Sequence, residues 1–448
     1  MKDSLKIKGN SASHSSTSLS ESMSKVSISS KSNENIDTDD IDENDESGQN
    51  ILLSIIAQLK PGCDLSKITL PTFILEKKSM LERITNQLQF PDIVLDAHQE
   101  KDELQRFVKI VKWYLAGWHI APKAVKKPLN PVLGEHFTCY WDLPNKQQAF
   151  YIAEQTCHHP PESAYFYMIP ESNIRVDGVV IPKSRFLGNS SAAIMAGETI
   201  LQFLDMKDKD GKPEKYTLSQ PNIYARGILF GKMRMEVGDH MIIKGPKYEV
   251  DVEFKTKGFI SGTYDAIEGV IKDKKGKEYY QISGKWNDIM YIKDLREKHA
   301  KKTVLFDTHK NKPLKPKVRP LEEQGEYESR RLWKKVTDAL AVRDHEVATE
   351  EKFKIEDYQR QLRKKRLEDG VEFHPKLFRK ANPGDDIDHY IYKHIPEGDD
   401  YEAQIKSILE IAPILPGQKF TEKFAIPAFK KHEIQEKSMS QLSLHKAK

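Results

Sequence analysis

Cysteine is scarce in this 448-residue chain, which has only Cys63, Cys139 and Cys157, widely spaced and without a C-x-x-C pair. This spacing suggests neither a disulfide framework nor a zinc ribbon. Long apolar runs are also missing, since no window approaches the roughly 18 consecutive apolar residues of a membrane-spanning helix. The first residues are rich in Lys and Ser, unlike the apolar core of a secretory signal. We therefore expect a cytoplasmic protein with reduced thiols.

Aromatic residues are absent from the first 48 residues, which contain 14 serines and an acidic run, Glu34 to Glu46, with eight acids and no base. Such a segment cannot bury enough apolar surface to fold, so we predict a disordered tail over 1–48. The tail carries five Lys and Arg against ten Asp and Glu, so the rest of the chain has nine more bases than acids. A basic body with an acidic arm suits transient contact with anionic membranes.

Period-two alternation dominates the middle of the chain, most clearly at 248–255, and no internal repeat of fixed period accompanies it. Similar half-buried runs bounded by Gly, Pro, Asn or Asp occur at 148–154, 163–169, 174–181, 199–204, 222–229, 234–243, 264–271 and 278–284. Many strands without intervening helices indicate an antiparallel meander, and so many strands in one sheet must curl into a barrel. A barrel this wide leaves a cavity.

Helical periodicity brackets the predicted sheet. Leu52, Ile55, Ile56 and Leu59 share one face of a short segment, which fits either an amphipathic flap or an ordinary core helix. Further apolar stripes or helical patterns occur at 80–88, 104–115, 321–341 and 349–369.

Two proline-containing motifs stand out as candidate binding elements. Residues 154–161 read EQTCHHPP, and the prolines hold His158 and His159 on a rigid, non-helical backbone. Such a pair suits a phosphate, although adjacent histidines are also common as structural features. Residues 123–135 read KAVKKPLNPVLGE, where two prolines force a turn that keeps Lys127 and Asn130 out of the core.

These motifs resemble the EQVSHHPP and KKPLNPxLGE signatures of the oxysterol-binding-protein-related lipid-transfer family. The first departs at Thr156-Cys157, where Val-Ser is commoner, but the histidines remain. The resemblance continues through SGKWND at 283–288 to the charged helix near Lys352 and covers roughly residues 50–430. It is strongest to the short yeast members that exchange phosphatidylserine for phosphatidylinositol 4-phosphate.

The resemblance implies an α+β, β-dominated fold, in which an incomplete antiparallel β-barrel encloses a lipid tunnel. The domains expected from it and from the composition are a disordered tail (1–48), a lid (49–75), a helical region with the signature loop (76–134), the β-barrel (135–310), a C-terminal helical subdomain (311–435) and a flexible tail (436–448).

The resemblance also assigns site residues. For phosphatidylinositol 4-phosphate it implies that the 4-phosphate is surrounded by His158, His159 and Lys127, that remaining phosphate charge is neutralised by Lys352 and Arg360, that inositol hydroxyls bond Glu356, and that the glycerol-linked phosphate bonds Asn130. For phosphatidylserine it implies Leu70, Lys127, Asn130 and Ser184. Lys352, Glu356 and Arg360 also fit a solvated ion-pair ladder, and the basic run 360–366 fits either a membrane-docking patch or ordinary solvent-exposed charge.

The predicted function is therefore exchange of phosphatidylserine and phosphatidylinositol 4-phosphate between the endoplasmic reticulum and the plasma membrane, by a peripheral protein at their contact sites. We expect no cofactor, metal or nucleic acid, and the sequence identifies no protein partner. Three alternatives stay open: a sterol carrier that exchanges its cargo for the phosphoinositide, a phosphoinositide sensor, and a hydrolase. The hydrolase would use Glu154 with the histidines or a Cys157–His158 dyad, which opposite-facing neighbours on an extended backbone disfavour.

Overall fold

The computed structural model describes residues 72–120, 125–228, 233–256, 263–396, 398 and 400–419. Contacts divide the chain into two units, Met1–Asp37 and Thr38–Lys448, and every described residue belongs to the second. The predicted tails and nearly all of the predicted lid, with its proposed helix, lie outside the described residues. Within the described part, no helix is long and apolar enough to cross a membrane.

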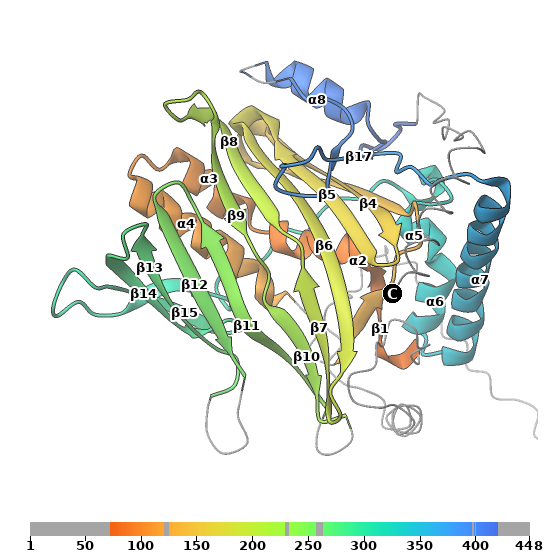
Figure 1. Ribbon diagram of the computed structural model, residues 1–448, viewed down its shortest axis with the longest axis horizontal. Coiled ribbons are helices and arrows are strands. Elements are labelled where there is room, and N and C mark those ends of the chain that lie inside the picture. The colour runs from red at the N-terminus through yellow and green to blue at the C-terminus, as the bar shows by residue number, and fades with distance from the viewer. Residues whose placement is uncertain are drawn as a thin grey trace, which may run out of the picture. The chain divides into compact units, whose positions relative to one another are not determined.

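A single 14-stranded sheet forms most of the described structure (Figure 1). Its strands are β3 (His136–Asp142), β4 (Gln148–His158), β5 (Pro161–Ile169), β6 (Ile174–Phe186), β7 (Ser190–Ala196), β8 (Thr199–Lys207), β9 (Pro213–Leu218), β10 (Asn222–Arg226), β11 (Arg234–Lys244), β12 (Tyr248–Lys255), β13 (Ala266–Asp273), β14 (Glu278–Lys285), β15 (Ile289–Asp294) and β16 (Thr303–Asp307). Neighbouring strands pair antiparallel, for example β4 with β5 and β12 with β13. The predicted β-dominated antiparallel architecture is confirmed.

The sheet curls without closing. Its strand order begins at β16 and ends at β3, and these two strands are not paired with each other in the part of the chain that the structure describes. The chain that follows β16 runs along the free edge of β3 instead. Lys317 and Tyr140 exchange backbone hydrogen bonds of 2.7 and 3.0 Å, and the Trp141 indole donates to the Leu314 carbonyl at 2.8 Å. An extended segment therefore covers the edge strand, which limits its pairing with other chains.

The sheet also forks along β6. The first part of β6, residues 174–178, pairs with β8, while residues 181–186 pair with β7. Gly197 joins β7 to β8 at this fork with a φ of 104°, and a Cβ there would lie 2.1 Å from the Val179 carbonyl oxygen. Only glycine combines that backbone conformation with so close an approach.

Helices α3 (Pro91–Gln99) and α4 (Glu103–Ala116) pack on the inner face of the sheet (Figure 1). Asp102 caps α4 by accepting a hydrogen bond from the Gln105 amide at 2.8 Å. The stripe predicted over 104–115 is buried in the largest apolar cluster, together with inward residues of the strands such as Val176 and Val180. Residues that recur with the 3.6-residue period of α4 and with the two-residue period of β6 therefore pack in the same apolar core.

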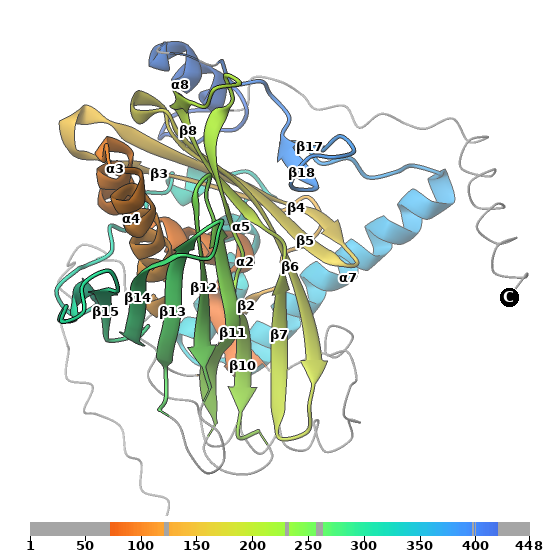
Figure 2. The same cartoon turned by 60° about the vertical axis from the view of Figure 1, so that its left-hand side comes forward.

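The outer face of β4, β5 and β6 is covered by the end of the described chain. The short hairpin β17 (Phe378–Lys380) and β18 (His389–Ile391) and the helix α8 (Tyr401–Leu409) bury a second apolar cluster against Phe150, Phe166 and Val179. Figure 2 shows β17 and β18 beside β4 and β5. These strands are thus buried on both faces, which explains why the run 148–154 is almost continuously apolar.

The remaining elements surround the two sequence motifs. They are η2 (Thr72–Ile74), β1 (Leu75–Ser79), α2 (Met80–Arg83), η3 (Ile84–Leu88), η4 (Gly117–His119), β2 (Lys127–Leu129), η5 (Pro144–Lys146), η6 (Pro170–Ser172), η7 (Leu321–Glu323), α5 (Ser329–Leu332), α6 (Lys334–Ala341) and α7 (His345–Asp369). β1 and β2 form a separate parallel pair.

Several local predictions were wrong. The helix expected over 321–341 is divided into η7, α5 and α6, and α7 begins at His345, before the predicted 349, because Asp344 accepts a cap hydrogen bond from Val347 N at 3.0 Å. α3 and the strands β3, β7, β9, β15 and β16 were not predicted. β7 shows why, since its sequence SSAAIMA has little contrast between its two faces and pairs through its backbone with β6 and β10.

Replacing Gly197 by Ala should destabilise the fold by roughly 3 kcal/mol, because the new methyl group meets the Val179 carbonyl and the positive φ is strained. Gly276→Ala is the matched control: its φ is 84°, but no atom of the described residues lies within 4 Å of the added Cβ, so we expect a loss of about 1 kcal/mol. Urea unfolding midpoints measure both losses. Equal losses of stability in the two variants would contradict a steric clash between a Cβ at position 197 and the Val179 carbonyl.

Candidate functional site

Backbone pairing brings the two sequence motifs together. His136 of β3 lies opposite Glu154 of β4, and the ladder continues beyond it. Gly134 N donates to the Gln155 carbonyl at 3.0 Å, and Gln155 N donates to the Glu135 carbonyl at 2.8 Å. The end of the signature loop and the start of the histidine motif are therefore adjacent backbone segments.

A β-bulge sets the direction of His158. Upstream of it, Phe150 and Ile152 lie on the outer face of β4. The pairing register shifts between Gln155 and Cys157, after which Cys157 lies opposite Glu162 and His158 opposite Pro161. Without this shift, strict alternation would place His158 on the same outer face as Ile152.

The two imidazoles form one unit at the end of the β4–β5 hairpin. Their ring centroids are 4.4 Å apart with planes at 66°. The His158 ring bonds the Pro131 backbone, which has only a carbonyl to offer, and its buried Nδ1 has no hydrogen-bond partner among the residues that the structure describes. Burial, with the nearby His159 and Arg363, lowers the pKa of His158 to about 4. His158 is therefore neutral at pH 7. The neighbouring His159 is exposed to solvent.

Helix α7 forms the third side of the site, beside the signature loop and the end of the β4–β5 hairpin. Lys352 pairs with Glu356 at 2.5 Å on its half-buried face. Burial, followed by the charge of Lys352, lowers the pKa of Lys127, while Glu356 acts in the opposite direction. The Gln359 side chain fixes α7 to the signature loop by accepting from Leu133 N at 2.7 Å. Lys127, Lys352 and Glu356 are thus close enough to interact electrostatically.

Arg360 lies apart from this face. It pairs with Asp357 at 3.3 Å, lies over the Phe353 ring at 5.3 Å, and its side chain is 56% exposed. Each residue of an α-helix is rotated by about 100° about the helix axis relative to the one before it. A residue eight positions after Lys352 therefore lies about 80° away from it around the axis, whereas one eleven positions after it lies only about 20° away. Arg363 occupies that position and affects the pKa of His158. The sequence prediction missed Arg363, although this spacing could have identified it.

The other predicted residues occupy different places. Asn130 is exposed in the loop after β2. Ser184 is half-buried on β6 opposite Ala193, and alternation places it on the same inward face as Val180. Leu70 lies outside the described residues. We define the head-group cluster as Lys127, His158, His159, Lys352, Glu356 and Arg363.

Glu135, the last residue of the signature loop, is a fully buried carboxylate that the sequence prediction did not single out. Its oxygens accept hydrogen bonds from Ser79 Oγ at 2.5 Å, Ser329 Oγ at 2.7 Å, Trp333 Nε1 at 2.9 Å and Val132 N at 3.0 Å. Burial raises the pKa of Glu135 and the four donors oppose that shift. One side chain thereby joins β1, the signature loop, α5 and the start of α6.

The geometry does not support the hydrolase alternative. Glu154 accepts hydrogen bonds from the Lys376 and Leu377 amides at 2.8 and 2.7 Å, and burial raises its pKa to about 7. Cys157 faces the side opposite to His158, so the two form no dyad. Among the described residues, no group of three His, Cys, Asp or Glu could hold a metal ion. The cluster can bind an anion but has no assembled nucleophile.

An incomplete barrel with a cationic cluster at its edge defines a ligand-binding protein. The family profile described as "Oxysterol-binding protein" matches residues 54–339, and the chain belongs to this family. Family members bind and transfer lipids and are not enzymes, so this chain is a lipid-binding and lipid-transfer protein.

Two relatives from Saccharomyces cerevisiae are very similar. Oxysterol-binding protein homolog 7 is 84% identical over 389 residues, which cover 87% of this chain and 89% of that protein. Oxysterol-binding protein homolog 6 is 70% identical over 443 residues, which cover 99% of both. The predicted resemblance to short yeast members is confirmed.

Solved structures share the fold at low identity. The Osh1 ORD domain in complex with cholesterol matches with a TM-score of 0.66 and 22% identity over 83% of this chain and 92% of that one. The Osh3 ORD in complex with PI(4)P, from Saccharomyces cerevisiae, matches with a TM-score of 0.57 and 18% identity over 81% and 94%. These matches confirm the fold class.

Replacing Glu135 by Ala should lower the free energy of unfolding by roughly 3 to 4 kcal/mol, because four buried donors lose their acceptor. Glu135→Gln keeps one acceptor oxygen and should fall between this variant and the wild type. The exposed Glu322→Ala is the control, with a change within about 0.5 kcal/mol. Chemical denaturation measures all three, and a neutral Glu135→Ala would contradict the proposed role of the carboxylate.

Proposed function

We propose that this protein extracts phosphatidylserine and phosphatidylinositol 4-phosphate from membranes and exchanges one for the other. The observation that carries the proposal is the head-group cluster, which holds three basic side chains and one carboxylate beside two imidazoles. A phosphate monoester carries about −1.5 to −2 charges at neutral pH and accepts several charge-assisted hydrogen bonds. The cluster is therefore better suited to such a ligand than to a neutral lipid head group.

Five of the six cluster residues have a proposed role that their chemistry allows. His158, His159 and Lys127 would surround the 4-phosphate, with Lys352 neutralising part of its charge. Glu356 would accept hydrogen bonds from inositol hydroxyls, since an ionised carboxylate only accepts. In a separate set of contacts, Asn130 would bond the glycerol-linked phosphate, and Arg360 would reach the ligand after leaving Asp357.

The acyl chains set a second requirement. Removing two chains with some 30 methylenes from a bilayer costs about 25 kcal/mol at about 0.8 kcal/mol each, far more than a few head-group bonds of ~1.5 to 3 kcal/mol return. An apolar tunnel must therefore receive the chains. The family fold and the inward-facing apolar residues of the curled sheet support this arrangement.

Phosphatidylserine would use the same tunnel with its head group read by Leu70, Lys127, Asn130 and Ser184. The inward position of Ser184 supports that assignment. Shared use of Lys127 and Asn130 makes the two lipids mutually exclusive. Because the two lipids exclude each other, a phosphoinositide gradient would drive their exchange. We propose that the exchange takes place at cytoplasmic contact sites between the endoplasmic reticulum and the plasma membrane, and the basic body of the chain supports contact with anionic membranes.

A sterol is the second candidate cargo, because the structurally similar Osh1 ORD domain was crystallised with cholesterol. Mass spectrometry of the lipids that co-purify with the protein distinguishes the candidates. Recovery of phosphatidylserine or phosphatidylinositol 4-phosphate supports the proposal. Recovery of sterol without phosphatidylserine favours the second candidate, and absence of any bound lipid favours a sensor.

His158→Ala combined with His159→Ala should abolish extraction of phosphatidylinositol 4-phosphate from liposomes and spare phosphatidylserine. Only the phosphoinositide has a monoester that needs the two additional donors. His309→Ala is a control, since this exposed histidine pairs with Asp288, between β14 and β15, and is not part of the head-group cluster. Equal loss of both lipids in the double variant would contradict the assignment.

Binding of the inositol head group should take up protons. A phosphate beside His158 raises the pKa of this histidine from about 4. At a pH between the pKa of the free protein and that of the complex, His158 therefore gains a proton when the ligand binds. The contribution of His158 to affinity rises as the pH falls through this range. Inositol 1,4-bisphosphate should therefore take up more protons when it binds the wild type than when it binds His158→Gln, whose side chain does not titrate. Calorimetry in two buffers of different ionisation enthalpy measures the difference, because the phosphate's own titration contributes to both proteins. Equal proton uptake by the two proteins would contradict contact between His158 and the phosphate.

A further inference from the structure

The segment 371–391, which we call the return segment, follows α7 and lies beyond residue 339, where the family match ends. α7 stops at Gly370, whose φ of 63° turns the chain. The return segment then crosses the outer face of β4 and β5 and forms β17 and β18 (Figure 2). It therefore connects the helix that carries Lys352 to the back of the hairpin that carries the histidines.

Its first contact is with the signature loop. Gly134, with a φ of 80°, lies against the Phe373 ring, and a Cβ at Gly134 would be 3.3 Å from Phe373 Cε2. The second contact is with the histidine motif, where the Glu154 carboxylate accepts the Lys376 and Leu377 amides. The return segment thus touches both motifs within five residues of its own chain.

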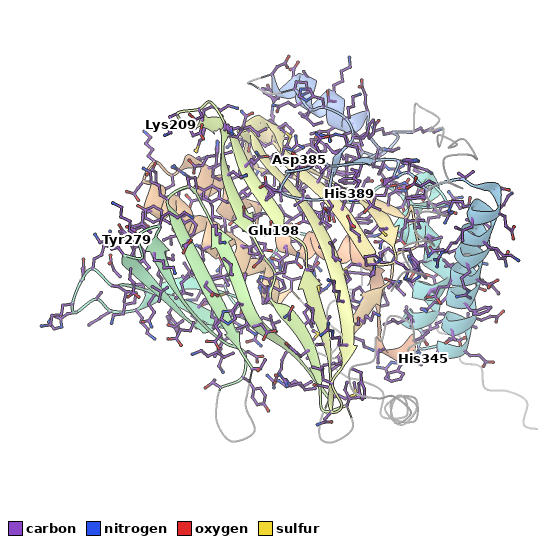
Figure 3. All side chains as sticks on the ribbon, viewed as in Figure 1. Glu198, Lys209, Tyr279, His345, Asp385 and His389 are labelled. Atoms are coloured by element: carbon purple, nitrogen blue, oxygen red, sulfur yellow. The ribbon has the colours of Figure 1, made fainter. Side chains whose placement is uncertain are left out.

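The third contact is at the hairpin tip. His389 Nδ1 lies 2.5 Å from Glu162 Oε1, and the two side chains are only 12% and 11% exposed. Figure 3 labels His389, which lies over β4 and β5. Glu162 directly follows Pro161, the residue paired with His158. A shift of Glu162 would therefore move the backbone opposite His158.

The contacts share a pattern. Glu154 and Glu162 stand four residues before and after His158, and both face the outer side of the sheet, while the bulge turns His158 to the other side. The return segment holds both carboxylates. Buried hydrogen bonds behind a ligand-binding side chain restrict its position, as supporting groups do behind metal ligands.

We propose that the return segment positions the histidine pair and that His389 is a positioning residue, acting through Glu162 on the phosphate-binding end of the β4–β5 hairpin. The inference rests on the proposed function. It follows that loss of the His389–Glu162 bond impairs the lipid that needs the histidines, phosphatidylinositol 4-phosphate, and leaves phosphatidylserine extraction unchanged.

The chain offers a matched control within the same segment. Asp386 pairs with Lys215 of β9 at 2.9 Å, with side chains that are 42% and 43% exposed. This ion pair also ties the return segment to the sheet, but it contacts β9 rather than the histidine hairpin. Asp386→Ala therefore loosens the segment without touching Glu162.

The test uses the full chain and liposomes that contain either phosphatidylinositol 4-phosphate or phosphatidylserine. His389→Phe keeps a ring of similar size and removes the donor, so we expect about a tenfold loss of phosphoinositide extraction, in the range seen when a supporting bond behind a ligand is removed. Phosphatidylserine extraction should stay within about twofold. His389→Gln restores a side-chain donor and should recover part of the loss. Asp386→Ala should extract both lipids like the wild type.

A spectroscopic signature separates positioning from general destabilisation. A histidine NMR titration of His389→Phe should show the pKa of His158 rising from about 4, because a displaced ring gains solvent, while Asp386→Ala leaves it in place. Unchanged phosphoinositide extraction by His389→Phe, or equal loss of both lipids, would overturn the inference.

The double histidine variant, run alongside, distinguishes the two possible failures. If it retains phosphoinositide extraction, the proposed function is wrong and the inference falls with it. If it loses extraction while His389→Phe keeps it, only the positioning role is wrong.

Discussion

The head-group cluster depends on the buried carboxylate of Glu135. Four donors from β1, the signature loop, α5 and the start of α6 converge on its two oxygens. Because a buried carboxylate is costly unless it is fully hydrogen-bonded, these elements cannot separate without a large loss of stability. The signature loop that results presents the Pro131 carbonyl to His158 and the Leu133 amide to Gln359 of α7. The signature loop, the end of the β4–β5 hairpin and α7 are therefore held in position relative to one another before any ligand binds.

The electrostatics of the empty cluster suit a ligand that arrives charged. Burial lowers the pKa values of both Lys127 and His158, so burial disfavours the protonated form of each side chain, and a bound anion would oppose this effect. The Lys352–Glu356 ion pair places a cationic and an anionic side chain next to each other in the cluster. Such a cluster favours an anionic ligand through the charge that the ligand supplies.

Much of the fold could be predicted from the sequence because its signals are local. The alternation at 248–255 and the stripe of α4 predicted a strand and a helix that the structure contains. Strands such as β7 were missed because their stability comes from pairing with neighbours. For the site, the two motifs located Lys127 and the histidines. The family resemblance assigned Arg360 on α7, whereas rotation about the helix axis brings Arg363 to the cluster.

The sequence by itself determined the family, the antiparallel curled sheet and the two motifs, because composition, period and motif spacing are properties of short segments. Only the tertiary structure decided which way the histidines point, since the bulge near Thr156 reverses the face on which His158 lies. It also decided the role of Glu135 and the contact between Glu162 and His389, 227 residues apart. The physical reason is that a side chain's partners depend on register and packing between distant segments, and local sequence patterns carry no information about either.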